Sequence, residues 1–187
     1  MVLAETRNPP IANAVLGTIF FVLVEAMFFA ALISSYLVIR AGAGLNWIPP
    51  ANVRLPVEAT AVNTVALLIS GVLMILSAKL FADKNPKARW FFLGSLVLGI
   101  SFVLLQGREW IGLIDVGMTI LSGVFAACFF LLIGLHGLHA ITAIIAMVYL
   151  WLTMQNDLIK VERIQAITIY WLFIVGIWPV LYGLVYF

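Results

Sequence analysis

The sequence predicts an all-α membrane protein, a polytopic bundle of five transmembrane helices forming one domain over residues 1–187. Two observations predict this class. Of the 187 residues, 65% are apolar and only 10% are charged, with a mean hydropathy of +1.18, which lies far from the balance of a water-soluble domain. Five apolar runs also reach about 20 residues. A bilayer admits such runs as helices, because each backbone amide must be hydrogen-bonded within the protein.

Charged and polar residues set the limits of the predicted spans. The first span holds one internal charge, Glu25, and the second ends before the polar stretch 83–89. No charge occurs between Asp115 and Asp157, an interval too long for one simple span and too short for two with a hairpin. One long, tilted helix after a short lead-in at 116–119 is therefore expected. The predicted spans are residues 13–40, 60–81, 90–110, 120–153 and 164–187.

The basic residues predict the orientation of the bundle. Most lie in the N-terminal segment and around the second and fourth connections, so the positive-inside bias places the N-terminus in the cytoplasm and the C-terminus outside. The loop 41–59, which contains Trp47 and prolines 49, 50 and 56, then forms an irregular connection at the outer interface. A net charge of +2 in short loops does not favour a nucleic-acid partner. The inner set is Arg7, Lys79, Lys84, Lys87, Arg89, Lys160 and Arg163, and the outer set is Arg40, Arg54 and Arg108.

Glu25 is the first candidate functional residue, because it lies near the middle of the first span. A carboxyl group at that depth costs about 3 kcal/mol on insertion scales, so it needs a partner or a proton. A functional interpretation is a proton relay or a lipid-facing switch. We prefer the structural interpretation, a neutral acid whose hydrogen bond locks two helices together.

His136 and His139 are the only histidines, and their i, i+3 spacing places both on one face near the middle of the fourth span. A bis-histidine haem needs ligands from opposite helices, and a dinuclear metal centre needs more histidines than this chain has. The single cysteine, Cys128, lies in an apolar run and allows no disulfide within the chain. We therefore predict no metal site, and a neutral histidine bonded to Glu25 or to a neighbouring polar group.

Further polar residues are candidates for helix contacts. Asn63 opens the second span and is expected to cap or bridge helices, and Gln106 closes the third. Arg108 and Glu109 are adjacent, so their side chains point apart, and each is expected to meet the outer interface or another subunit. The tryptophans are expected mostly in aromatic belts at the span ends. They are Trp47, Trp90, Trp110, Trp151, Trp171 and Trp178.

Five segments, in order along the chain, resemble cytochrome c oxidase subunit III. Residues 24–30 are similar to the family's Ser-Glu-x-x-Phe-Phe-Ala, which places Glu25 at its characteristic intramembrane carboxylate. Residues 63–71 resemble Asn-Thr-x-x-Leu-Leu-x-Ser-Gly, and residues 104–110 resemble Leu-Leu-Gln-x-x-Glu-Tyr. Residues 134–139 resemble Gly-Phe-His-Gly-Leu-His, the most specific signature. Residues 170–178 are similar to the closing Tyr-Trp-His-Phe-Val-Asp-Val-Val-Trp.

The sequence departs from this family in two ways. Leu172 and Val175 stand where the closing motif usually has a histidine and an aspartate, so the polar contacts of those groups do not transfer. The full-length family has seven helices, and this chain resembles shorter forms that begin at the glutamate-bearing helix. The family's lipid-holding cleft therefore needs its missing wall from another subunit.

The resemblance implies an accessory role in a bacterial inner-membrane, proton-pumping oxidase that reduces oxygen. The family member itself binds no haem or copper, which lie in partner subunits, and it packs directly on subunit I, with subunit II in the same complex. It supports assembly and sustained proton uptake, and it binds phospholipid. The alternatives are a homologous accessory subunit of a quinol oxidase or nitric oxide reductase, a small proton-coupled transporter, and a haem-bearing, quinone-reactive anchor.

Overall fold

The computed structural model describes residues 13–44, 47, 55–154 and 160–187, and these described residues form five α-helices and no strand. Each helix has between 26 and 31 residues and is apolar enough to cross a membrane, since 26 residues of α-helix span about 39 Å and the hydrocarbon core is about 30 Å thick. The predicted all-α class is confirmed. The helices are α1 (Asn13–Ala43), α2 (Val57–Ala82), α3 (Ala88–Asp115), α4 (Val124–Thr153) and α5 (Val161–Tyr186).

The connection between α3 and α4 differs most from the sequence prediction. α3 continues to Asp115, and α4 begins only at Val124, so residues 116–123 form a turn rather than a lead-in and the start of a helix. Gly117 has φ +90° and Gly123 has φ +125°, values that side-chain-bearing residues rarely adopt. Two glycines in this conformation end one helix and delay the next. The N-terminal segment 1–12 and residues 45–46 and 48–54 of the loop 41–59 lie outside the described residues, whereas residues 41–43 belong to α1 and 57–59 to α2.

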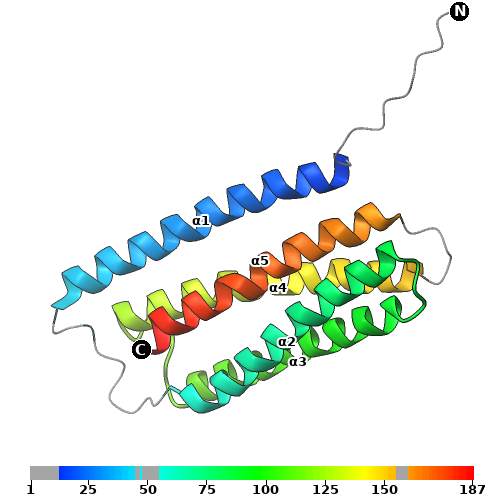
Figure 1. Ribbon diagram of the computed structural model, residues 1–187. Coiled ribbons are helices and arrows are strands. Elements are labelled where there is room, and N and C mark those ends of the chain that lie inside the picture. Colours follow the sequence, from blue (N-terminus) through cyan, green and yellow to red (C-terminus); the bar gives the residue numbers. More distant parts are fainter. Residues whose placement is uncertain (1–12, 45–46, 48–54, 155–159) are drawn as a thin grey trace, which may run out of the picture.

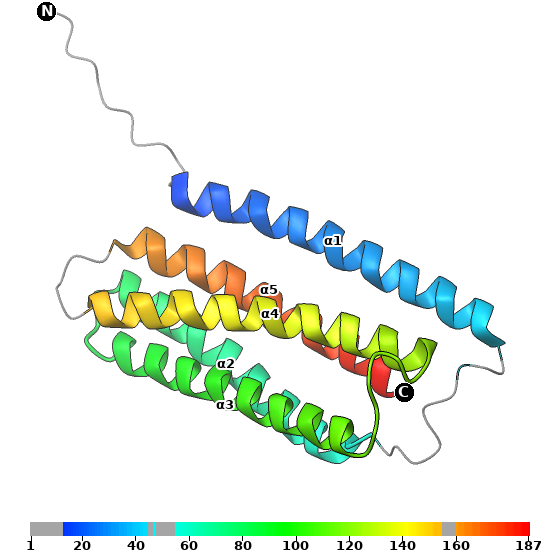
Figure 2. The same ribbon diagram turned by 180° about the vertical axis from the view of Figure 1, so that it is seen from behind.

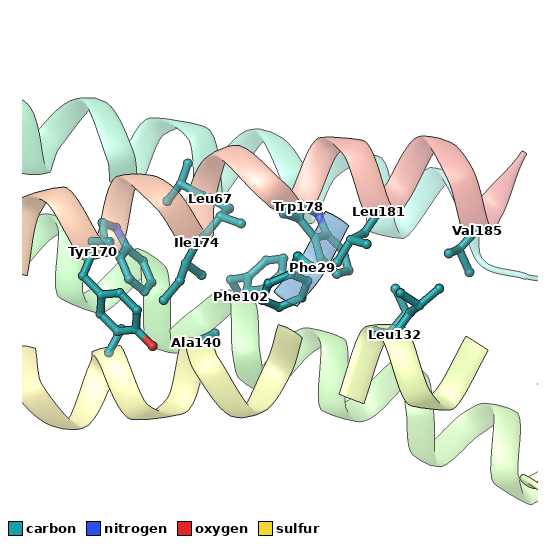
Figure 3. Close-up of a cluster of buried hydrophobic side chains, with 14 of the residues drawn as sticks. Phe29, Leu67, Phe102, Leu132, Ala140, Tyr170, Ile174, Trp178, Leu181 and Val185 are labelled. Carbon is teal, nitrogen blue, oxygen red and sulfur yellow. The ribbon is translucent and has the colours of Figure 1, made fainter. Parts of the chain in front are cut away.

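α4 and α5 are the central helices of the bundle, because α5 contacts α1, α2 and α4, and α4 contacts α1, α3 and α5. In both Figure 1 and Figure 2, α4 and α5 lie between α1 and the α2–α3 pair. α1 is the least enclosed helix, since only Phe29 and Tyr36 among its described residues are buried. Figure 3 shows core side chains from several helices gathered along α5, among them Leu67 and Ile174. α1 therefore buries fewer residues than any other helix of the bundle.

Small residues bring α2, α3 and α5 close together. The hydroxyl of Ser70 on α2 donates to the carbonyl of Ser95 on α3 at 2.9 Å, and Ser95 returns a hydrogen bond to the carbonyl of Ser70 at 2.8 Å. Nε1 of Trp171 on α5 donates to Oγ of Ser70 at 2.9 Å. Small residues and interhelical hydrogen bonds of this kind hold membrane helices together, because lipid gives apolar side chains no preference for each other.

Gly99→Ala should destabilise the bundle by about 1–3 kcal/mol, the usual cost of overpacking a core. A Cβ atom at Gly99 would lie 2.8 Å from two ring carbons of the buried Trp171. Gly112→Ala on the same helix is the matched control, because a Cβ atom there meets nothing within 4 Å. The control should be neutral or up to about 1 kcal/mol stabilising. Equilibrium unfolding in detergent measures both, and equal effects would refute the proposed contact.

Candidate functional site

A carboxylate–imidazole contact joins α1 to α4 inside the membrane span. Nε2 of His139 lies 2.8 Å from Oε2 of Glu25, and the two side chains are 16% and 15% exposed. This glutamate oxygen makes no hydrogen bond to any other described group. The contact gives Glu25 the partner that its depth in the bilayer requires.

The second nitrogen of His139 defines where protons lie in this pair. Nδ1 is 2.6 Å from the carbonyl oxygen of Leu135, and a carbonyl oxygen only accepts, so Nδ1 must carry a hydrogen. A neutral His139 then presents a bare Nε2, and Glu25 must be the protonated partner. If the proton moves to Nε2, the pair becomes a carboxylate and an imidazolium. Both forms have zero net charge, which is the condition for burying the pair in hydrocarbon.

Aromatic rings surround the Glu25–His139 pair. The ring of Phe29 meets the imidazole of His139 edge to face, with the centroids 5.1 Å apart, and the ring of Phe28 lies 6.1 Å away. Phe29 is 1% exposed. These rings limit access of water to the pair, and a drier site strengthens the interaction between its members.

His136 does not join the pair. It is 1% exposed, and its ring lies over Trp178 with centroids 5.0 Å apart and an interplanar angle of 32°. Neither of its ring nitrogens has a hydrogen-bond partner among the described residues. The structure therefore separates the predicted cluster into the Glu25–His139 pair and an independent buried histidine.

A second polar group lies where α2, α3 and α5 meet. Oε2 of Glu109 accepts hydrogen bonds from the hydroxyl of Thr60 at 2.7 Å and from Nε2 of Gln106 at 3.1 Å. Nε2 of Gln106 also donates to the hydroxyl of Tyr186 at 3.0 Å. Glu109 thus points into the bundle, whereas the neighbouring Arg108 is exposed. Nearby, Nδ2 of Asn63 donates to the carbonyl of Phe102 at 3.2 Å and links α2 to α3.

Sequence reasoning misplaced two tryptophans. Trp171 and Trp178 are 0% exposed and so do not belong to an aromatic belt. Nε1 of Trp178 donates to Oγ1 of Thr64 at 2.8 Å, in the same way that Trp171 bonds to Ser70. Their spacing of seven residues places both on one face of α5. This spacing could have predicted from the sequence that the two indoles pack against the same neighbouring helix. Their indoles face α2 because α5 is central.

α1 has a second attachment near its C-terminal end, which the sequence did not suggest. The hydroxyl of Tyr36 donates to the carbonyl oxygen of Leu184 on α5 at 2.8 Å, and Nη1 of Arg40 donates to the same oxygen at 3.2 Å. Eleven residues separate Tyr36 from Glu25, which is close to three helical turns, so these groups share one face of α1. α1 is therefore held by polar contacts at its middle and near one end.

The fold and this site define a multi-pass membrane protein whose buried polar groups connect helices. No three His, Cys, Asp or Glu side chains in the described part of the chain lie close enough to hold a metal ion together. Bundles of this class serve many functions. The chain matches the cytochrome c oxidase subunit III family over residues 8–187, and it belongs to that family.

Individual relatives agree with this family. The probable cytochrome c oxidase subunit 3 of Nocardia farcinica is 35% identical to this chain over 177 residues. That of Mycobacterium leprae is 33% identical over 178 residues, and the cytochrome c oxidase subunit 3 of Corynebacterium diphtheriae is 32% identical over 179 residues. Each alignment covers 91% of this chain and 86% of the relative.

Proposed function

We propose that this chain is the accessory subunit III of a haem-copper terminal oxidase in a bacterial cytoplasmic membrane. It packs directly on subunit I, which together with subunit II holds the haem and copper, and it supports assembly of the complex and sustained proton uptake by subunit I. The relatives are named as subunits of cytochrome c oxidase, which favours this parent complex over a quinol oxidase or a nitric oxide reductase.

The Glu25–His139 contact carries this proposal. It joins the carboxylate of one family-like motif to the imidazole of the most specific motif at 2.8 Å. The pair fixes α1, which otherwise buries only Phe29 and Tyr36 among its described residues. A subunit that binds no redox centre acts through its shape, so the position of α1 is part of the surface that a partner meets.

The cytoplasmic N-terminus is part of the same proposal. Figure 1 shows the start of α1, the α2–α3 turn and the start of α5 at one end of the bundle. The basic residues Lys84 and Lys87 lie in that turn, Arg89 lies at the start of α3, and Lys160 and Arg163 lie at the start of α5. Positive charge gathered at one end supports placing that end in the cytoplasm.

The lifetime of the oxidase during turnover tests the proposed role. Purified complexes that contain Glu25→Gln or His139→Phe should complete several-fold fewer catalytic cycles before inactivation than the unaltered complex. Thr142→Ala is the matched control, because Thr142 is an exposed residue of the same helix as His139 and bonds only to the carbonyl of Leu138 among described groups. Unchanged assembly, stability and lifetime in both variants would reject a role for the pair.

A groove between α1, α4 and α5 supports binding of a phospholipid. Its volume is about 520 Å³, and its walls are mostly apolar. The lining includes two side chains with polar ends, Arg163 and Tyr149. Arg163 lies near the start of α5, at one end of the bundle. A lipid would place acyl chains along Phe21 and Ile167 and its phosphate near Arg163, since arginine pairs well with phosphate.

Arg163→Gln should reduce the anionic phospholipid that stays with the detergent-purified protein by about half or more. Glutamine keeps a polar side chain but loses the charge that pairs with phosphate. The control is Arg89→Gln, which removes an exposed arginine outside the groove. Native mass spectrometry of retained lipid measures the effect. Equal retention in both variants would show that the groove does not select a phosphate headgroup.

A further inference from the structure

A partly enclosed cavity of about 260 Å³ lies between α3 and α4 and reaches α5 at Trp178. This volume has room for several water molecules. Most of its wall is apolar, but the lining includes three polar side chains, Gln106 and Trp110 of α3 and His136 of α4. The oxidase role assigned above requires no such cavity.

The three polar side chains carry four hydrogen-bonding atoms that have no partner among the described residues. These are Oε1 of Gln106, Nε1 of Trp110 and both ring nitrogens of His136. Gln106 is 7% exposed and His136 is 1% exposed. Folded proteins rarely leave buried polar atoms unpaired, and a cluster of them beside one cavity indicates a bound polar molecule.

The roles of these atoms define the chemistry of that molecule. Nε1 of Trp110 can only donate. The Nε2 group of Gln106 is committed to Glu109 and Tyr186, so the free atom of its amide is the oxygen, which accepts. A neutral His136 offers one donor and one acceptor. The set therefore has two donors and two acceptors, which suits a molecule that both donates and accepts and does not suit an ion or an acyl chain.

Glycines keep the cavity open. A Cβ atom at Gly107 or Gly137, which both line the cavity, would meet no atom within 4 Å. At Gly134 a Cβ atom would lie 3.0 Å from the ring of Trp110, so this glycine allows the indole to pack against α4. One face of His136 is covered by Trp178, and His136 is itself one of the residues that line the cavity.

We propose that this cavity is a water-binding site inside the bundle, where a small cluster of water molecules bridges His136, Gln106 and Trp110. Water is the smallest molecule that donates and accepts, and bridging waters commonly satisfy buried polar groups. Because Gln106 also bonds to Glu109, the cluster extends the polar network of α2 and α3 to the buried histidine of α4.

A high-resolution density map of the purified membrane complex tests this site directly. We expect ordered water within about 3.2 Å of a ring nitrogen of His136 and of Oε1 of Gln106. A dry cavity, an acyl chain in it, or a side chain of another subunit that bonds to His136 would each overturn the proposal. This result does not depend on the electron donor or on the lifetime of the oxidase.

Filling the cavity provides a second test. Gly137→Leu should displace the water and lower the thermal midpoint of this subunit within the complex by at least about 3 °C. Gly176→Leu is the matched control, because Gly176 is also helical, is exposed and has nothing within 4 Å of its Cβ position. Adding His136→Phe should raise the midpoint of Gly137→Leu, since the unpaired imidazole is then gone. Equal midpoints for the two leucine variants would contradict a water site.

Discussion

Trp178→Ala should lower the free energy of unfolding by about 3 kcal/mol, the lower end of the usual range for a buried aromatic side chain. Trp178 is 0% exposed, packs edge to face on Phe102 with centroids 4.9 Å apart, and donates to Thr64 at 2.8 Å. Figure 3 shows Trp178 and Phe102 together in the core. Because lipid already surrounds the unfolded chain, the loss comes from the cavity, the missing contacts and the lost hydrogen bond to Thr64.

Trp90→Ala is the control for this prediction, because it removes the same side chain from a site that is 62% exposed. It should cost less than about 1 kcal/mol, as exposed substitutions usually do. Denaturant titration in mixed detergent micelles, followed by circular dichroism, measures both variants. Similar losses at Trp178 and Trp90 would mean that α5 does not occupy the centre of the bundle.

Breaking the Glu25–His139 pair should have the next largest effect. Glu25→Leu or His139→Phe alone should each cost about 2 kcal/mol, within the usual cost of leaving a buried hydrogen-bonding partner unsatisfied. The double variant should cost less than the sum of the two, because it leaves no unpaired polar group behind. The coupling free energy from this double-mutant cycle measures the pair itself.

A control variant and a second measurement test whether the double-mutant cycle reports on this pair specifically. Glu162→Leu removes an exposed carboxylate from the first turn of α5, and it should show no coupling to His139→Phe. Protease sensitivity of α1 should increase in each single variant, since the pair is one of its two polar attachments. Additive losses in the cycle would show that the 2.8 Å contact contributes nothing to stability.

The helices were predictable because apolar run length alone determines them. Their ends were less so: α3 stops just before Gly117 and α4 starts directly after Gly123, and both glycines have a positive φ that the apolar pattern does not reveal. The shared depth of Glu25 and the two histidines suggested a contact. Whether His136 or His139 contacts Glu25 depends on how α1 packs against α4. His139 makes the contact, whereas His136, three residues earlier on α4, packs against Trp178.

Other parts of the site could not be predicted either, because they also depend on how the helices pack against one another. The tryptophans were expected mostly at span ends, but α5 contacts α1, α2 and α4, and its buried residues, among them Trp171 and Trp178, are spread from Ile164 to Tyr186. The hydrogen bond from Thr60 of α2 to Glu109 of α3 depends on how α3 is rotated about its own axis relative to α2. Periodicity defines the faces of one helix and not the neighbour that each face meets.

Co-purification is the most direct test of the central claim, that this family member serves as an oxidase subunit. An affinity-tagged chain extracted in mild detergent should carry the haem-bearing subunit I in equimolar amount, with the haem absorbance of an oxidase and with oxygen consumption on reduced cytochrome c. A chain that purifies alone as a stable, monodisperse protein without a haem-bearing partner would contradict the account and favour a transporter.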